Sequence, residues 1–384
     1  MEAYLDNSAT TRCYEEVRDI VVKTMMEDYG NPSSMHLKGV ETEQYLKRSA
    51  AAIAKTMKVQ EKEIYFTSGG TESNNWALYG TAMANRRKGM HIITTQIEHA
   101  AISAPLAALE DQGFTVTRLG VQKNGCISLE ELEAAITDET ILVSVMYVNN
   151  EVGTVEPIQQ IGELIKKKNP NTLFHVDAIQ AYGKFRIYPK RMKIDLLSAS
   201  GHKIHGPKGI GFLYIGDKVK INPMILGGGQ QKGMRSGTDN VPGVAGLGVA
   251  AEIMYKNLDQ NLEQMRSVKH HLMEGLAQIE DVIINGPSED EAAPYILNAS
   301  FMGIRSEVLL HTLEDRGIYV SAGSACSSHK RAGSATLTAI GCSKMEMEAA
   351  VRFSFAETTT IEEIDYTLQV LKNIVPALRK YTRR

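Results

Sequence analysis

Residues 141–178 read ILVSVMYVNNEVGTVEPIQQIGELIKKKNPNTLFHVDA, and this stretch decides the fold. It begins with an apolar run at 141–148, continues through a helix-like stretch at 157–169 and ends in a second apolar run at 172–178. Short apolar runs on either side of a helical stretch are typical of a β-α-β unit, whose two strands are parallel. The sequence therefore predicts an α/β fold with a parallel sheet.

The same rhythm extends from residue 63 to about residue 215. Further apolar runs occur at 63–68, 91–95, 114–120, 195–200 and 209–215, and they alternate with helix-like stretches at 71–84, 101–113 and 128–136. This alternation predicts a largely parallel sheet that is covered by helices. In such sheets ligands bind at the carboxyl ends of the strands, so the loops that follow the strands are the place to look for chemistry.

A second, smaller unit follows this region. A long helical stretch from about 244 to 280 looks like a connector. Beyond it, the sequence predicts strands at 296–302 and 318–323 and helices at 306–317 and 360–380. The second unit is therefore expected to be α+β.

Composition excludes several classes of function. Lys and Arg (42) nearly balance Asp and Glu (45), so no strong field points toward nucleic acid or an anionic membrane. No apolar run approaches the roughly 20 residues that a membrane helix needs. The acidic, polar N-terminus lacks the pattern of a signal peptide. Four cysteines without CxxC or zinc-ligand spacing are expected to be reduced thiols, with no metal site. We therefore expect a cytoplasmic protein.

The segment FTSGGTESNNWAL at 66–78 places two glycines and Thr71 between a strand and a helix. Free amides at a helix N-terminus suit a phosphate, although an ordinary glycine turn with a Thr cap has the same pattern. The string GLGVAA at 246–251 resembles a dinucleotide motif, but it lies inside a helical stretch with no strand before it. An NAD or ATP site therefore has little support.

Two further loops carry candidate polar groups. In LFHVDAIQAYGK (173–184) Asp177 ends an apolar strand, where it either pairs with a cation or caps the next helix. In SASGHKIHGPKGIG (198–211) a lysine could serve as a Schiff-base amine, and composition does not choose between Lys203 and Lys208 or exclude a plain glycine hairpin. Both segments predict a site at strand ends.

One of the four cysteines has a setting that suits a nucleophile. Cys326 lies in SAGSACSSHKRAGSATL (321–337), directly before His329, Lys330 and Arg331. Nearby cations favour the thiolate, although a buried or incidental free cysteine is the simpler interpretation of any single thiol. The other cysteines, Cys13, Cys126 and Cys342, have no such setting and are expected to be structural.

Taken in order, these segments resemble the cysteine desulfurases, which are class V, fold-type I pyridoxal-phosphate enzymes. The resemblance runs from YLDNSATT at 4–11 almost to the C-terminus and includes TSGGTESNN, IEHAA, VNNEVGTVEPI, HVDAIQ, SGHKIHGPKG, GMRSGT and SAGSACSS. It implies a large domain with a mostly parallel seven-stranded sheet and a smaller α+β domain. The implied boundaries are 15–258 for the large cofactor-binding domain, and 1–14 with 259–384 for the small domain.

The resemblance also implies how pyridoxal 5'-phosphate would be held. Lys203, rather than Lys208, would be the Schiff-base lysine, and Asp177 would pair with the pyridinium nitrogen. His99 would stack on the ring, and Gln180 and Asn150 would reach its oxygen side. The phosphate would be bound by Gly70, Thr71, Ser200, His202 and, from a second subunit, Thr238. A homodimer would therefore be part of the site.

The implied reaction removes sulfur from L-cysteine. Arg352 would clamp the substrate carboxylate, assisted by Asn150, and Asn31 lies in another active-site segment of the family. Lys203 would remove the α-proton, and Cys326 would take the sulfur as a persulfide while L-alanine leaves. The spacing after Cys326 resembles the NifS/IscS-like group, whose long cysteine loop would carry the sulfur to an acceptor protein for iron–sulfur cluster assembly or for tRNA or cofactor thiolation.

Other classes of function compete with this interpretation. A selenocysteine lyase or another class V aminotransferase would use the same Lys203 and Asp177, and an inactive scaffold would keep only the fold. The chain also departs from its relatives in two places. Ala356 and Glu357 stand where a small and a basic residue are common, and the sequence ends at Arg384, short of the tail that docks the iron–sulfur scaffold in housekeeping relatives.

Overall fold

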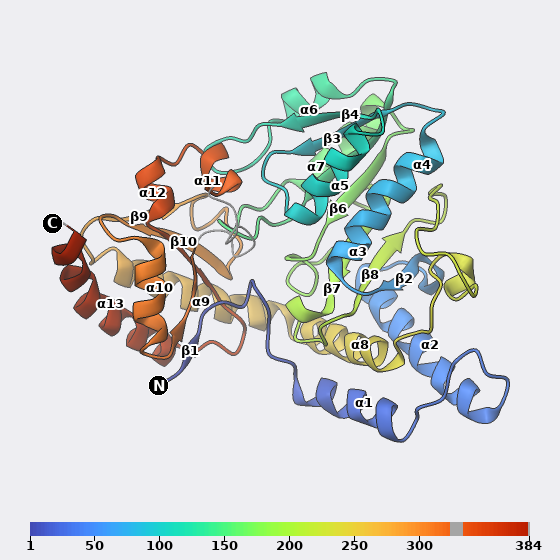
Figure 1. Ribbon diagram of the computed structural model, residues 1–384, viewed down its shortest axis with the longest axis horizontal. Helices are drawn as coiled ribbons and strands as arrows, with labels where there is room; N and C mark the ends of the chain where they lie inside the picture. Colours follow the sequence, from blue (N-terminus) through green and yellow to red (C-terminus); the bar gives the residue numbers. More distant parts are fainter. Residues whose placement is uncertain (323–332, 383–384) are drawn as a thin grey trace.

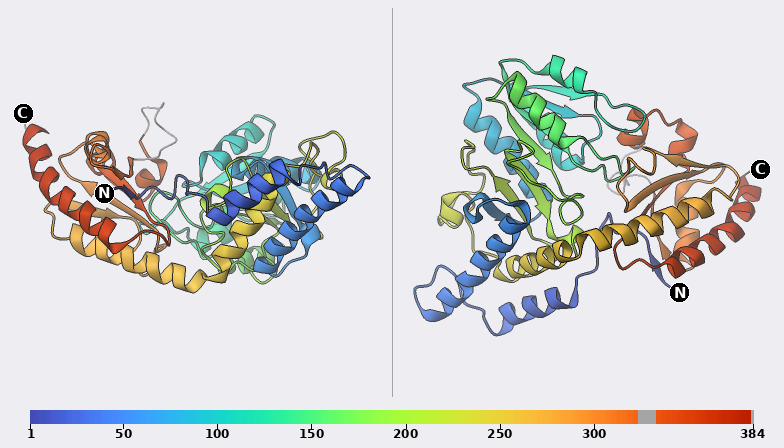
Figure 2. Two further views of the ribbon diagram at one scale, coloured as in Figure 1. Left: turned by 90° about the horizontal axis from the view of Figure 1, so that it is seen from below. Right: turned by 180° about the vertical axis from the view of Figure 1, so that it is seen from behind.

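Two main β-sheets organise the chain, as a computed structural model describes for residues 1–322 and 333–382 (Figure 1). The larger sheet has seven strands in the order β2-β8-β7-β6-β5-β3-β4, and the smaller sheet has four in the order β12-β13-β10-β9. The two sheets lie in separate lobes, which Figure 2 shows from two further sides. The predicted α/β fold, with a large sheet domain and a smaller α+β domain, is confirmed.

The seven-stranded sheet is mostly parallel because only β8 opposes its neighbours, β2 and β7. Residues of β5, β7 and β8 are buried along each whole strand, which explains their near-continuous apolar runs. All the predicted strands of this region form. Their bounds are β2 Ile64–Thr67, β3 His91–Thr95, β4 Thr115–Leu119, β5 Thr140–Met146, β6 Leu173–Asp177, β7 Leu196–Ser200 and β8 Gly211–Ile215.

Helices cover both faces of this sheet. The succession α3–α4 and α5 lies in front of the sheet in Figure 1, and α7 lies in front of it when the molecule is seen from behind in Figure 2. No described helix is long and apolar enough to cross a membrane. The bounds are α1 Glu15–Met26, α2 Leu37–Met57, α3 Gly70–Asn75, a π-helical turn Trp76–Gly80, α4 Thr81–Asn85, α5 Ala100–Glu110, α6 Leu129–Ala135 and α7 Ile158–Lys168.

The connector to the smaller sheet is two helices, where the sequence predicts one from 244 to 280. Helix α8 (Val241–Lys256) and α9 (Leu258–Leu276) are separated at Asn257, whose φ of −115° and ψ of 23° lie outside the helical region. Figure 2 shows them running in succession from beneath the large sheet to the small one. The break is confined to the backbone of this one asparagine, so the apolar pattern continues on either side of it.

The predicted strand at 318–323 is also divided. Its first half, β11 (Ile318–Tyr319), pairs in parallel with β1 (Ala3–Tyr4), whereas β12 (Ser321–Ala322) pairs with β13. The chain therefore starts against the small domain. The remaining elements there are β9 Val282–Asn285, β10 Ile296–Phe301, β13 Ala350–Ser354, α10 Ser306–Glu314, α11 Ala335–Ala339, α12 Lys344–Glu348 and α13 Ile361–Thr382.

Glu156, in the segment between β5 and α7, is a buried carboxyl with incomplete hydrogen bonding. Its side chain is 2% exposed, Oε2 accepts a hydrogen bond from the Ile127 N–H at 3.3 Å, and Oε1 has no partner. Burial raises the pKa of Glu156 to about 8. The carboxyl is therefore protonated in the folded chain at pH values where the unfolded chain is ionised, and stability is lost as pH rises toward 8.

Replacing this carboxyl should remove that loss. We expect Glu156→Gln to raise the free energy of unfolding at pH 8.5 by up to about 5 kcal/mol, and to change it little at pH 5. Urea unfolding at both pH values measures the difference. Glu163→Gln, at an exposed position on α7, is the matched control. A gain that is equal at both pH values would contradict the assignment to ionisation of Glu156.

Candidate active site

Loops at one edge of the seven-stranded sheet carry most of the predicted site residues. The parallel strands β2, β3, β5, β6 and β7 end at this edge, because parallel strands share a direction. The residues that follow or end them are Gly70 and Thr71 after β2, His99 after β3, Asn150 after β5, Asp177 and Gln180 at β6, and Ser200, His202 and Lys203 at β7. The fold thus gathers residues that are up to 133 positions apart.

Asp177 is the buried carboxylate of this edge, with 4% of its surface exposed. Its Oδ2 accepts from Asn74 Nδ2 at 2.7 Å and its Oδ1 from the Ile179 N–H at 3.0 Å. Burial raises the pKa of Asp177, although these hydrogen bonds and the charges of His99 and Lys203 oppose the shift. A cation placed against Asp177 would stabilise its ionised form, as a protonated ring nitrogen would.

Lys203 closes the short turn that follows β7, and its amine is held by the N-terminal segment of the chain. Nζ donates to the carbonyl oxygens of Ser8 and Ala9, the latter at 2.8 Å. Gln180 Nε2 donates to the same Ser8 oxygen at 3.0 Å, which leaves its buried Oε1 without a partner. Residues near the start of the chain therefore form one wall of the site, which the sequence analysis did not identify.

Two histidines at this edge have defined orientations. His99 caps α5, and its Nδ1 accepts from the Ala101 N–H at 3.1 Å. His202 Nδ1 lies 3.3 Å from Thr10 Oγ1. Burial, followed by the charges of Lys203 and other lysines, lowers the pKa of His202 to about 4. His202 is therefore neutral at pH 7 and retains one N–H that can donate to an anion.

The glycine pair before α3 allows the start of this helix to approach β7 closely. Gly69 has a φ of 147°, and a Cβ added there would have Ser200 Oγ as its neighbour at 3.8 Å. A Cβ at Gly70 would lie 2.2 Å from Ile179 Cδ1, so a larger residue there would displace the Ile179 side chain. The N-terminal amides beside Thr71 and the Ser200 hydroxyl therefore face one space, which suits a phosphate.

Arg352, on β13 of the small domain, is a buried cation with a fixed orientation; its side chain is 3% exposed. Nη1 donates to the Asn150 carbonyl oxygen at 2.8 Å and Nη2 donates to Asp6 Oδ1 at 2.7 Å. Its Nε is buried and has no hydrogen-bond partner in the part of the chain that the structure describes. These contacts aim the guanidinium while leaving donors for a carboxylate. Asp6 is a second contact that the sequence analysis did not identify.

The predicted residues Thr238 and Asn31 lie apart from this group. Both are exposed, and among the described residues no hydrogen bond links either of them to Lys203 or Asp177. Their neighbours Ser33 and Asp239 line the same pocket of about 570 Å³.

The described cysteines provide a comparison for Cys326, which lies outside the described residues. Burial raises the pKa of Cys126 to about 12 and also raises the pKa of Cys342, so both stay thiols at neutral pH. Cys13 is exposed, and its Sγ donates to the Gly206 carbonyl oxygen at 3.1 Å. The structural role expected for Cys126 and Cys342 agrees with these environments.

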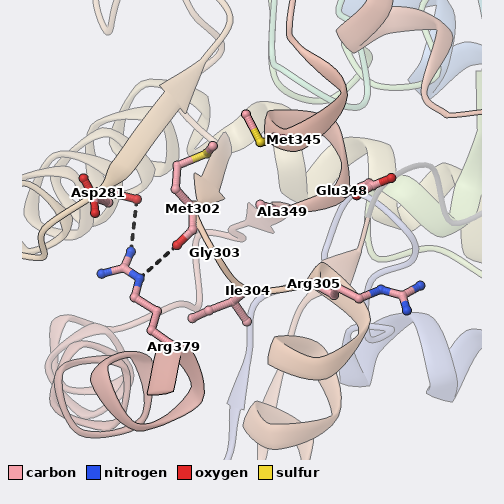
Figure 3. A pocket seen from close by; sticks show the side chains of 9 residues that line it. All are labelled: Asp281, Met302, Gly303, Ile304, Arg305, Met345, Glu348, Ala349 and Arg379. Atoms are coloured by element: carbon pink, nitrogen blue, oxygen red, sulfur yellow. Dashed lines mark hydrogen bonds between the residues drawn. The ribbon is translucent and has the colours of Figure 1, made fainter. Parts of the chain in front are cut away.

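A separate pocket of about 330 Å³ lies in the small domain (Figure 3). Arg379 crosses it from α13, donating from Nε to the Met302 carbonyl oxygen at 2.9 Å and from Nη2 to the Asp281 carbonyl oxygen at 3.1 Å. None of the predicted site residues lines this pocket. Arg379 anchors the end of α13 there, and the candidate site is formed by the strand-end loops.

The residues at the strand ends fit pyridoxal phosphate. A buried carboxylate ends β6, an amine stands on the turn after the neighbouring strand β7, and the start of α3 with Ser200 and His202 supplies donors for a phosphate. The buried Ser8 Oγ and Gln180 Oε1, which lack hydrogen-bond partners among the described residues, are further polar atoms that a ligand would satisfy. Asn74 is a further contact of this group, and its only sequence signal is the polar helix start TESNN.

Comparisons with known proteins agree with this chemistry. A family model described as aminotransferase class-V matches residues 3–367. A curated relative from Clostridium botulinum, "Cysteine desulfurase IscS", is 44% identical over 99% of this chain and 96% of its own length. A solved structure, "NIFS-LIKE PROTEIN", has a TM-score of 0.94 and 38% identity, covering 98% of this chain and all of its own. Another, "SspA in complex with cysteine", has a TM-score of 0.81 and 33% identity over 93% of this chain and all of its own.

Proposed function

The chain belongs to the aminotransferase class-V family and is a cysteine desulfurase, and we propose that it converts L-cysteine to L-alanine while Cys326 keeps the sulfur as a persulfide. The observation that supports this function is that Lys203, Asp177 and Arg352 each act near the carboxyl ends of the parallel strands. Lys203 lies close enough for its charge to act on Asp177. Arg352 reaches the same edge of the sheet through Asn150.

Each residue has a distinct role in the proposed reaction. Pyridoxal phosphate, when bound, supplies an electron sink for the carbon that loses its proton. Asp177 holds the proton on the ring nitrogen, and Arg352 binds the substrate carboxylate through its free N–H groups. Lys203, on the β7 turn, removes the α-proton and returns a proton before L-alanine leaves. His99, capping α5, provides the flat face on which the ring is proposed to lie.

In the proposed sulfur transfer, Cys326 is the nucleophile. Its thiolate attacks the substrate sulfur, so that an S–S bond forms, the C–S bond breaks, and the electron pair stays with the substrate carbon, which takes a proton. The persulfide then passes to an acceptor with a thiol. "SspA in complex with cysteine" is a related protein whose title names cysteine as its ligand, which supports L-cysteine as the substrate here.

An assay of purified protein tests this function. L-cysteine should yield alanine and, with a thiol reductant, sulfide in equal amounts. Cys326→Ala should yield neither, although it keeps the visible absorbance of the bound cofactor. Alanine from L-selenocysteine alone would instead indicate a selenocysteine lyase. Amino transfer to keto acids that survives in Cys326→Ala would indicate an aminotransferase, and a colourless protein that binds no cofactor would indicate an inactive scaffold.

The partner of this chain is proposed to be a second copy. Large apolar side chains are exposed at the end of α1, at the start of α2 and at residues 224–226, among them Met26 (72%), Leu37 (79%) and Leu226 (78%). The pocket of about 570 Å³ is lined by residues near these segments in the chain, among them Ser33 before α2 and Asp239. Exposed large apolar side chains favour an interaction site, and we propose a homodimer that covers them and brings Thr238 to the phosphate of the other copy.

A charge placed on this surface should separate the copies. We expect Leu226→Glu to weaken the dimer at least about tenfold, because the carboxylate would be desolvated in an apolar contact. Sedimentation velocity over a range of concentrations measures the change. Met345→Glu, at another exposed apolar position (68%), is the matched control and should leave the dimer intact. A wild-type protein that sediments as a monomer would contradict the proposed partner.

The acceptor and the compartment complete the proposal. Iron–sulfur cluster assembly and tRNA or cofactor thiolation both need a protein that receives a persulfide, and such a protein is the proposed second partner. We place the enzyme in the cytosol, where thiols such as Cys13, Cys126 and Cys342 are kept reduced.

A further inference from the structure

Glu357 is a buried carboxylate that lies outside the candidate site, between the segment of Arg352 and the loop of Lys203. It lies just after β13, on the same segment as Arg352, and its side chain is 12% exposed. Its Oε1 accepts a hydrogen bond from the Tyr14 hydroxyl. Its Oε2 lies 3.2 Å from His205 Nε2, and the His205 side chain is only 5% exposed. Glu357 thus connects the small domain to the loop that carries Lys203.

His205, its partner on that loop, is held in an unusual backbone conformation. Its φ of 61° is left-handed, a region that non-glycine residues leave unless the surroundings fix them. The His205 ring stacks on Tyr14 with 4.5 Å between centroids, and Nδ1 lies 2.7 Å from the Arg12 carbonyl oxygen. The His205 N–H donates to Thr11 Oγ1 at 2.8 Å. The N-terminal segment and Glu357 together therefore fix His205.

The charge of Glu357 is stable in this buried position. Burial by itself would raise the pKa of Glu357, but the bonds and charge of His205 and the Tyr14 hydroxyl bring the pKa down to about 2. The ammonium of the buried Lys184 lies 4.5 Å over the Tyr295 ring. Burial lowers the pKa of Lys184, and the Glu357 charge acts against that shift. An ionised carboxylate is thus present at every working pH, between groups that favour it.

We propose that Glu357 is a positioning residue for Lys203: through His205, two residues further along, it fixes the lysine loop relative to the strand that carries Arg352. Lys203 has to reach the substrate carbon while Arg352 holds the substrate carboxylate, so the distance between the two segments sets the geometry of proton transfer. This role rests on the proposed function. A carboxylate suits this position because its charge lies near His205 and Lys184.

Three variants separate the parts of this contact. Glu357→Ala removes the carboxylate. Glu357→Gln keeps its shape, because the amide oxygen can accept from Tyr14 and the amide nitrogen can donate to a neutral His205 that still donates from Nδ1 to Arg12. Tyr14→Phe removes one hydroxyl and keeps the stacking. Glu362→Ala, at an exposed position of α13 on the same segment, is the matched control.

The kinetic result expected of Glu357→Ala is a kcat about 10- to 100-fold lower than that of the wild type. The KM for L-cysteine should stay within about twofold, because Asp6 and Asn150 still hold Arg352. Glu357→Gln should recover most of the kcat, Tyr14→Phe should give an intermediate value, and Glu362→Ala should match the wild type. Restoration by the amide distinguishes positioning from the loss of packing.

A second readout does not depend on turnover. The rate at which apoenzyme takes up pyridoxal phosphate, followed by absorbance without cysteine, should fall in Glu357→Ala because Lys203 is no longer presented in one position. A Glu357→Ala protein that melts earlier but keeps the wild-type uptake rate and kcat would overturn the proposal. If Glu357→Ala does not fold, wild-type values in both Glu357→Gln and Tyr14→Phe would overturn it as well. Wild-type protein that makes no alanine would refute the proposed function, and the uptake rates would still decide the role of Glu357.

Discussion

Lys203→Ala is expected to lower alanine formation from L-cysteine by about 10²- to 10⁴-fold, the range typical of a lost general base. The Lys203 amine stands on the turn after β7, where the carbonyl oxygens of Ser8 and Ala9 accept its hydrogens. Lys203 is the amine proposed to act at this edge of the sheet, and its partners Ser8 and Ala9 accept through backbone carbonyl oxygens. The loss should therefore be in kcat, with a melting temperature close to that of the wild type.

Lys208→Ala is the control for this prediction. Lys208 lies five positions later on the same glycine-rich loop, is exposed, and was the other candidate amine in the sequence. We expect it to keep wild-type turnover. Alanine formation measured for both variants decides the assignment: loss in Lys208→Ala with activity in Lys203→Ala would transfer the role of the base to Lys208.

The sequence predicts the large sheet well because its signals are local. Each strand of the sheet is a short apolar run between turn residues, and this pattern depends only on neighbours in the chain. The site loops follow from the same signal, because residues after parallel strands must meet at one edge. Asp177, Lys203 and Asn150 therefore reach one place, as the order of the strands requires.

What the sequence does not predict depends on contacts between distant segments. Asp6 pairs with Arg352 across 346 positions, and Ser8 binds Lys203 across 195. Nothing in the DNSATT run of residues 6–11 marks these carbonyl and carboxylate contacts. The pairing of β11 with β1 likewise divides a strand that has one continuous apolar pattern. Such features follow from tertiary packing, which overrides local propensity.

Glu357 is another residue whose role the sequence does not predict. In the sequence, Glu357 departs from the pattern of the family that the chain resembles, and the sequence does not show how this residue changes the charge near Arg352. In the fold it lies between Tyr14 and His205, which come from segments 343 and 152 positions away. A polar residue is therefore interpretable only once its partners are known, because burial without partners would be costly and burial with them is stabilising.

Asp177→Asn is expected to separate the stability of the apoprotein from its activity. The neutral amide keeps the shape of the carboxylate. Asn74, whose Oδ1 has no partner, can turn its amide so that Oδ1 accepts a hydrogen from the new side chain. Because burial raises the pKa of Asp177, stability is lost as pH rises through that pKa, and the amide removes this loss. Apoprotein carrying Asp177→Asn should thus be at least as stable as the wild type at pH 8.

The same substitution removes the only carboxylate proposed to face the ring nitrogen. Breaking a buried charge pair costs about 3–5 kcal/mol, so we expect alanine formation to fall roughly 10²- to 10³-fold and pyridoxal phosphate to bind more weakly. Asp195→Asn should have the opposite effects on stability and activity. Asp195 Oδ2 accepts from Lys166 Nζ at 2.6 Å and from the Phe174 N–H at 2.7 Å, and Asp195 directly precedes β7, away from the carboxyl ends of the strands. Asp195→Asn should lower the urea midpoint and keep turnover per folded enzyme. Wild-type turnover and cofactor affinity in Asp177→Asn would show that the ring nitrogen has a different partner.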